Sequence, residues 1–349
     1  MAELTSLERC MTVLQGGVPD RVPVCLENFM HAATVGGYTI QEYCLDGDKI
    51  ADAQLKTWER FRHDMIDVEN GVAAMAHAVG CKVEFTEDAA PWVIGPAIES
   101  LEQVDELRPI DPYQDGTLPE LIKAAQIISK EVGQHVCLLS EADQGPFSLA
   151  AHIITPLELL TAVLDPDKEA LIRRLLDYAT EQVLRYARAL HDAGAHLTMI
   201  GDSIAGPDVC SPDIYRRFAF PYERRLVDTL RAEGKEIGLH VCGNATRIID
   251  PMIGTNSIFL QVDYKIDHDT CKRAASGKTT LIGTVDPSGV MALGVADQVT
   301  HKARYDIEHL GRDGGFILSP GCALPHTTPD ENVYALVEAA RVYGRYDAH

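Results

Sequence analysis

A histidine and a cysteine stand two residues apart where a buried strand is expected to end. The stretch "EIGLHVCGNAT" (236–246) runs from apolar residues into His240 and Cys242. Side chains two residues apart on a strand point to the same side, so an imidazole and a thiol project together. A distant cysteine, Cys322 in "ILSPGCALP", follows the last expected strand. A Cys2His set with a fourth position open to water or substrate is the arrangement of a catalytic zinc site.

The residue types leave a second interpretation open. Cys242 and Cys322 can be small buried hydrophobic residues, and His240 a hydrogen-bonded core histidine. The total of nine cysteines in a long chain favours reduced thiols in the cytoplasm over a disulfide framework. The remaining seven are expected to be packing residues: Cys10, Cys25, Cys44, Cys81, Cys137, Cys210 and Cys271.

Charge and composition exclude several classes of partner. The chain has 349 residues, 46% of them apolar, and a formal net charge of −21. A nucleic-acid binder needs a basic face to displace counterions, and an anionic membrane surface attracts basic segments. We therefore expect neither nucleic-acid nor membrane partners. No apolar run approaches the roughly 20 residues that span a bilayer, and the first 17 residues are expected to form an amphipathic helix rather than a secretory signal.

Short β-rich runs alternate with helical patterns along most of the chain. Eight such runs are expected to be strands: 21–27, 64–69, 135–141, 196–202, 236–241, 258–263, 279–284 and 315–320. Runs this apolar suit a parallel sheet covered on both faces. Eight alternations of strand and helix favour a (β/α)8 TIM barrel, with a doubly wound open sheet as the alternative.

We expect one domain over residues 1–349. A cap helix is expected within residues 1–20, and an inserted cap region at about 70–130 that contains a small β-hairpin. Two helix boundaries carry specific expectations. Pro221 should kink the helix that starts after Ser211, and a capping box at Thr328 should open the last helix.

Reacting groups of such barrels lie where strands end and βα loops begin. The polar residues expected there to bind substrate are Glu27, Asn28, His31, Glu141, Gln144, Asp202 and Asp263. Asp202 and Asp263 are also candidates to orient His240 or to complete the coordination of the metal. The alternative role of each is a helix N-cap or a loop ion pair.

The chain resembles the uroporphyrinogen decarboxylase superfamily, and within it the branch of zinc-dependent, cobalamin-linked methyltransferases. The resemblance lies in "GPFSLAAHI", "HVCGNATRIID", "LIGTVDP" and "LSPGCALPHTTPDENVYALVEAAR". It implies zinc on His240, Cys242 and Cys322, and methyl transfer between a small substrate, a methoxy compound or a thiol, and the cobalt of a corrinoid. The decarboxylases carry an arginine-rich "RQAGRY" segment and a late Gly-His-Gly. Here the corresponding stretches read "ENFMHAA" and Gly321-Cys322-Ala323, which counts against decarboxylation.

The corrinoid is expected on a separate partner protein. The usual cobalamin-binding signature, Asp-x-His-x-x-Gly, is not matched by "DHDTCKRAASG" (267–277) in spacing or context. The partner would dock at the C-terminal face of the barrel. Few charges near residues 27–33 indicate a small neutral substrate such as a methoxy-arene. The alternatives are a metal-free decarboxylase and a non-catalytic tetrapyrrole-binding protein.

Overall fold

Eight parallel strands form a nearly closed barrel in the computed structural model, which describes residues 3–346. The strand order is β1-β2-β5-β6-β7-β8-β9-β10, and every neighbouring pair is parallel. A parallel bridge between Val24 and Leu318 joins the first strand to the last, where the Leu318 amide donates to the carbonyl of Pro23 at 2.9 Å. The predicted (β/α)8 barrel is confirmed, and the open-sheet alternative is not.

All eight expected strand runs appear in the barrel. Their observed bounds are β1 (Cys25–Leu26), β2 (Met65–Val68), β5 (Cys137–Gln144), β6 (Leu197–Gly201), β7 (Ile237–Val241), β8 (Phe259–Val262), β9 (Thr280–Val285) and β10 (Phe316–Pro320). The expected hairpin is present as β3 (Lys82–Glu84) and β4 (Trp92–Gly95), which pair antiparallel.

The barrel interior has an apolar floor. Inward-facing side chains of successive strands form one cluster: Cys25, Met65, Cys137, Leu139, Leu197, Met199, Phe259, Ile282 and Ile317. Strand β7 contributes Gly238 at this level, and a Cβ there would lie 2.1 Å from the ring of Phe259. The glycine therefore makes room for the ring. The next inward-facing positions, residues 240 and 242, lie toward the mouth, which is the end of the barrel where the strands finish.

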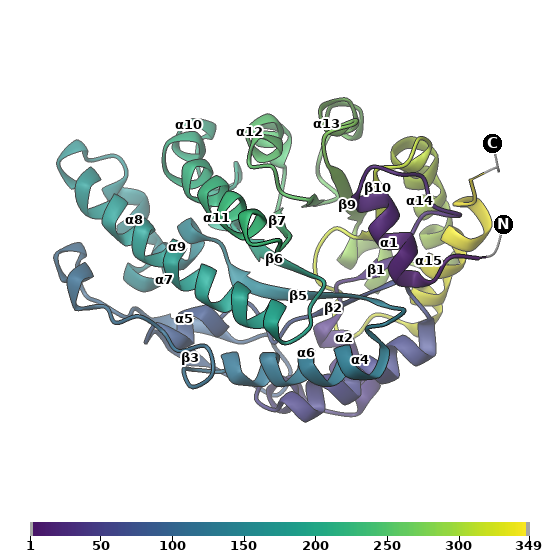
Figure 1. The fold of residues 1–349 in the computed structure, drawn as a ribbon, viewed down its shortest axis with the longest axis horizontal. Coiled ribbons are helices and arrows are strands. Elements are labelled where there is room, and N and C mark those ends of the chain that lie inside the picture. Colours follow the sequence, from purple (N-terminus) through teal and green to yellow (C-terminus); the bar gives the residue numbers. More distant parts are fainter. Residues whose placement is uncertain (1–2, 347–349) are drawn as a thin grey trace.

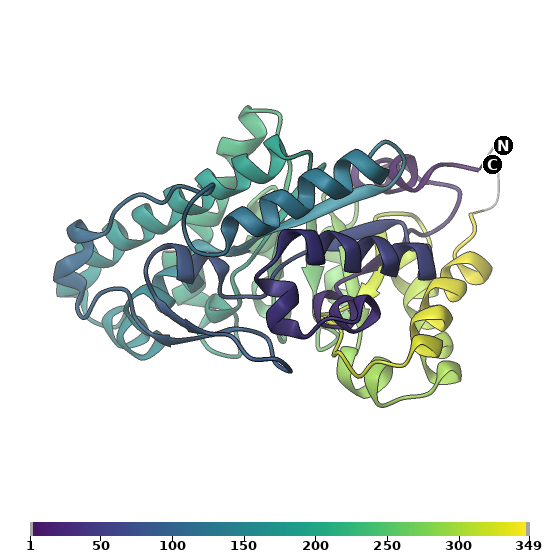
Figure 2. The ribbon, with the colours of Figure 1, turned by 90° about the horizontal axis from the view of Figure 1, so that it is seen from below.

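Helices cover the outside of the barrel. Figure 1 shows them around the sheet, and Figure 2 shows α4 and α6 side by side against it. Their bounds are α1 (Ser6–Leu14), α2 (Phe29–Gly36), α3 (Ile40–Cys44), α4 (Gly47–Phe61), α5 (Ala74–Ala78), α6 (Leu118–Val132), α7 (Pro146–Ile154), α8 (Pro156–Ala162), α9 (Glu169–Asp192), α10 (Pro212–Ile214), α11 (Phe220–Ala232), α12 (Ile249–Gly254), α13 (His268–Ala275), α14 (Ala296–Asp306) and α15 (Asp330–Tyr343). Among the described residues, none of these helices has the length and apolar character needed to cross a membrane.

Two expected helix features take a different form. Ser211 caps α10 by accepting from the Ile214 amide, but residues 215–219 are π-helical and α11 begins at Phe220. The helical run is continuous from Pro212 to Ala232, and Pro221 directly follows its π-helical segment, a type of irregularity that often accompanies a helix kink. The predicted capping box at Thr328 is wrong. The last helix has Pro329 as its N-cap residue, with no side-chain bond, and the buried Thr328 hydroxyl has no partner among the described residues.

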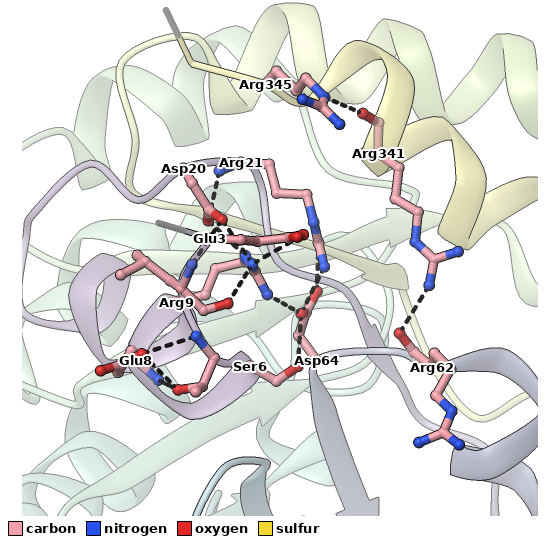
Figure 3. Close-up of polar contacts among 12 residues, drawn as sticks. Glu3, Ser6, Glu8, Arg9, Asp20, Arg21, Arg62, Asp64, Arg341 and Arg345 are labelled. Carbon is pink, nitrogen blue, oxygen red and sulfur yellow. Dashed lines mark hydrogen bonds and ion pairs between the residues drawn. The ribbon is translucent and has the colours of Figure 1, made fainter. Parts of the chain in front are cut away.

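Helix α1 closes the lower end of the barrel, and a buried carboxylate anchors it. Asp64 accepts from Arg9 at 2.7 Å and from both terminal nitrogens of Arg21 at 2.6 and 2.8 Å (Figure 3). It also accepts from the Ser6 hydroxyl at 3.0 Å and the Val24 amide at 2.9 Å. Five donors thus surround a side chain that is 1% exposed, as a buried charge requires.

Asp64→Ala should lower the free energy of unfolding by about 3–5 kcal/mol, because it leaves two buried guanidinium groups without their shared carboxylate. Asp228→Ala is the matched control. Its partner Arg224 lies 3.4 Å away, with both side chains about half exposed, so its removal should change stability by roughly 0–1 kcal/mol. Urea denaturation of both variants measures the difference. Equal losses would contradict the anchoring role of Asp64.

Candidate metal centre

His240 is fixed by a backbone carbonyl of the neighbouring strand. Its Nδ1 lies 3.2 Å from the carbonyl oxygen of Gln261 on β8, which can only accept a hydrogen bond. Nδ1 therefore carries a proton, and Nε2 points toward Cys242, 2.9 Å from its sulfur. A hydrogen bond of this kind orients the imidazoles that ligate metals through the other nitrogen.

The two cysteine sulfurs are spaced as in a tetrahedral metal site. Sγ of Cys242 lies 3.8 Å from Sγ of Cys322, and the ligand atoms of both cysteines and of His240 all lie within 4.8 Å of one another. Two sulfurs each about 2.3 Å from a tetrahedral zinc lie roughly 3.8 Å apart. Among the described residues, this is the one group of three such ligands.

The three side chains strongly shift one another's pKa values. The hydrogen bond with Cys322 and the charge of His240 lower the pKa of Cys242 to about 3 despite its burial. Burial lowers the pKa of His240, but the charge of Cys242 and its hydrogen bond outweigh this and raise that pKa to about 9. The bond to Cys242 and burial hold the pKa of Cys322 well above its usual range. A thiolate is the form of cysteine that binds metals, and the lowered pKa of Cys242 favours that form.

Tight loops bring the two cysteines together. Gly243, at φ +79°, follows the first cysteine, and its amide donates to Asp263 at 2.8 Å. Gly321 precedes the second, and a Cβ there would lie 2.7 Å from the amide nitrogen of Tyr264. Both loops therefore pack against the segment that follows β8. The seven other cysteines are buried, as expected of packing residues, and only Cys242 and Cys322 are partly exposed.

Glu27 and Glu141 lie at the mouth with the metal centre. Glu27 accepts from the Gln261 amide at 2.8 Å, and burial raises its pKa to about 7. Glu141 is 7% exposed, and one of its oxygens has no partner within residues 3–346. Asn28 is buried beside Glu27 at the start of α2, and its amide atoms likewise lack partners there.

Other predicted site residues make structural contacts instead. Asp202 accepts from the Phe147 and Ser148 amides at 3.1 and 2.6 Å, so it caps α7. Gln144 donates to the carbonyl of Val72 at 2.9 Å, which ties β5 to the loop after β2. Asp263 supports the loop of Cys242, as described above, and does not contact His240. Helix residue His31 packs against Phe61, with ring centroids 5.7 Å apart, and lies 3.4 Å from Asp330.

Four buried polar residues facing the mouth lie outside the predicted substrate-binding set: Asp67, Glu69, Gln261 and Ser319. Each follows an inward-facing residue of the apolar floor by two or four positions. The spacing of Asp67 and Glu69 repeats that of His240 and Cys242, so the sequence carries that signal. The backbone carbonyl of Gln261 leaves no signal in the sequence, because every residue has a backbone carbonyl.

Comparison with known proteins places the chain among enzymes of two kinds. Methylcobamide:CoM methyltransferase MtaA of Methanosarcina barkeri is 27% identical over 98% of this chain and 99% of its own. A solved methyltransferase from Methanosarcina mazei superposes with a TM-score of 0.88 at 27% identity, covering 97% and 99% of the two chains. Uroporphyrinogen decarboxylase of Gloeobacter violaceus is 26% identical over 87% and 86%.

These matches confirm the resemblance that the sequence motifs indicated, including the similarity to the methylcobamide-linked methyltransferases. The family model described as uroporphyrinogen decarboxylase (URO-D) matches residues 5–343, which is nearly the whole chain. The barrel, its strand order and the residues at its mouth all lie within that match. The chain therefore belongs to the uroporphyrinogen decarboxylase (URO-D) family.

Proposed function

We propose that this protein is a zinc-dependent methyltransferase that moves a methyl group between a small thiol and the cobalt of a separate corrinoid protein. The observation that carries the proposal is the 3.8 Å separation of Cys242 and Cys322, with His240 beside them. Thiolates and imidazole are ligands that suit zinc. The names of its relatives as methylcobamide:CoM methyltransferases support the reaction class.

Three protein ligands would leave the fourth position of a tetrahedral zinc ion open to substrate. When bound, zinc lowers the pKa of a coordinating thiol and so supplies a thiolate near neutral pH. His240, held by the Gln261 carbonyl, presents Nε2 to the ion, and the loops of Cys242 and Cys322 fix the two sulfurs.

Transfer of the methyl group from cobalt to sulfur needs no further reactant. The thiolate sulfur attacks the methyl carbon of methylcobalt(III), so a sulfur–carbon bond forms and the cobalt–carbon bond breaks. Both electrons of that bond stay on the metal as cobalt(I), and the proton of the thiol passes to water. The protein positions the reactants and keeps the substrate sulfur as a thiolate, and it forms no covalent bond with the methyl group itself.

The mouth also offers a surface for a corrinoid partner. Large apolar side chains are exposed on loops that follow strands β2, β6 and β9: Val72, Val209, Leu293 and Val295. These loops belong to the C-terminal face of the barrel, where the metal centre lies. A corrinoid partner would have to approach this face of the barrel to reach the metal centre.

Charge disfavours decarboxylation of a porphyrinogen carboxylate. Among residues 3–346, the buried arginine and lysine side chains are Arg9 and Arg21, and both bind Asp64 at the opposite end of the barrel. The mouth carries carboxyl groups instead. An anionic tetrapyrrole would meet no buried arginine or lysine there.

Metal analysis tests the centre directly. The purified protein should hold about one zinc per chain, as a single Cys2His site does, and Cys242→Ser or Cys322→Ser should lose most of it. Cys81→Ser is the control, because this buried thiol donates to the carbonyl of His152 and a hydroxyl can replace it. Circular dichroism checks that all variants fold. Full zinc content in both ligand variants would contradict the centre.

Methyl transfer tests the reaction. With methylcobalamin and a small thiol, the zinc-loaded protein should convert the visible spectrum to that of cob(I)alamin under anaerobic conditions. Cys322→Ser should slow this at least about 100-fold, because the substrate sulfur loses its activating ion. Decarboxylation of a uroporphyrinogen by the metal-free protein, with no methyl transfer, would overturn the proposal.

A further inference from the structure

We propose that the thiol substrate carries a protonated amine, and that carboxyl groups beside the metal centre bind it. The inference deepens the proposed function and rests on it for the thiol. It differs from the neutral substrate that residues 27–33 indicated. The supporting observations are the placement of the carboxyl groups, their lack of partners and the absence of a buried arginine or lysine near them among the described residues.

The carboxyl groups are aimed into the mouth by strand geometry. Cys25 and Met65 are opposite each other in the register of β1 and β2, and both belong to the inward-facing floor. Two residues further on, Glu27 and Asp67 face the same way, one beside the other. On β5, Glu141 follows the inward-facing Leu139 by two residues.

The polar atoms of this layer lack donors. Both oxygens of Asp67 and one each of Glu69 and Glu141 have no partner among the described residues. Two residues that are not acidic show the same lack: Gln261 through its side-chain oxygen and Ser319 through its hydroxyl. All five are at least nine-tenths buried. Buried acceptors without donors are rare because each is unfavourable, so this set matches a ligand that brings N–H groups.

Charge points to the same ligand. Burial, followed by the charges of neighbouring carboxyl groups, raises the pKa values of Asp67 and Glu141 well above their usual range. Several carboxylates cannot all ionise side by side in a buried site without a compensating cation. The charge of His240 acts in the opposite direction on Asp67, but His240 is bonded to the sulfur of Cys242. The buried arginines Arg9 and Arg21 lie at the other end of the barrel. An ammonium group on the substrate supplies the missing charge.

The carboxyl layer is connected to the metal centre by one residue. Gln261 accepts from His240 through its backbone carbonyl and donates to Glu27 through its side chain at 2.8 Å. The amide of Leu324, two residues after Cys322, donates to the carbonyl of Glu27 at 2.7 Å. These bonds place Glu27 next to the segments that carry the metal ligands, so we infer a compact ligand that reaches both the ion and the carboxyl groups. The ligand class is a small aminothiol.

Three thiols with the same two-carbon chain separate charge from size: 2-aminoethanethiol, 2-mercaptoethanol and 2-mercaptoethanesulfonate. Calorimetry on the zinc-loaded protein gives their dissociation constants, and methylcobalamin consumption gives kcat/KM. The cationic thiol should bind at least tenfold more tightly than the neutral one, and the anionic thiol most weakly. Asp67→Asn and Glu141→Gln should each reduce this preference several-fold. Glu308→Gln, at an exposed helix pair with Arg304, should keep it.

The outcomes distinguish this inference from the proposed function. Active methyl transfer with equal binding of the three thiols, or with preference for the sulfonate, overturns the inference and leaves the function. Preferential binding of the cationic thiol with no transfer to any of them supports the amine site and overturns the function. A second zinc per chain that Asp67→Asn removes would assign the carboxyl groups to a metal and overturn the inference. If one variant does not fold, the other carries the test.

Discussion

The alternation of side chains along parallel strands is the constraint on which the site depends. Every second residue points into the barrel, so apolar residues low on the strands form a packed floor and polar residues higher up form the layer above it. Gly238 lets Phe259 complete the floor beneath His240. The imidazole and the sulfur of Cys242 thus rest on close-packed side chains, which limits their movement.

Much of this arrangement could be predicted from residue types and spacing. The eight apolar runs indicated the barrel, and two-residue spacing indicated that His240 and Cys242 project together. The partnership with Cys322 followed from its place after the last strand. Contacts made by the backbone could not be predicted, because a carbonyl such as that of Gln261 has no sequence signature. For the same reason, the backbone amides that donate hydrogen bonds to Asp202 and to Asp263 could not be predicted from the sequence.

The two ends of the barrel treat buried carboxylates in opposite ways. Asp64 has five donors and two guanidinium partners, and such a site favours stability. Asp67, three residues later, has no donor within residues 3–346 although it is equally buried. Buried polar groups without hydrogen-bond partners are tolerated at sites where a protein binds or converts a ligand. Among the described residues, a fully paired carboxylate thus lies at the lower end and an unpaired one at the mouth.

The seam where β1 meets β10 and closes the barrel has a consequence for how the chain folds. Helix α1 packs beneath strands near the C-terminus, with the Thr280 hydroxyl donating to the carbonyl of Val13, and Val24 pairs with Leu318. These pairings join residues far apart along the chain, so closing the barrel requires long loops to form, which slows folding. Until the seam closes, the apolar surface that it covers stays exposed, which makes partly folded chains prone to aggregation.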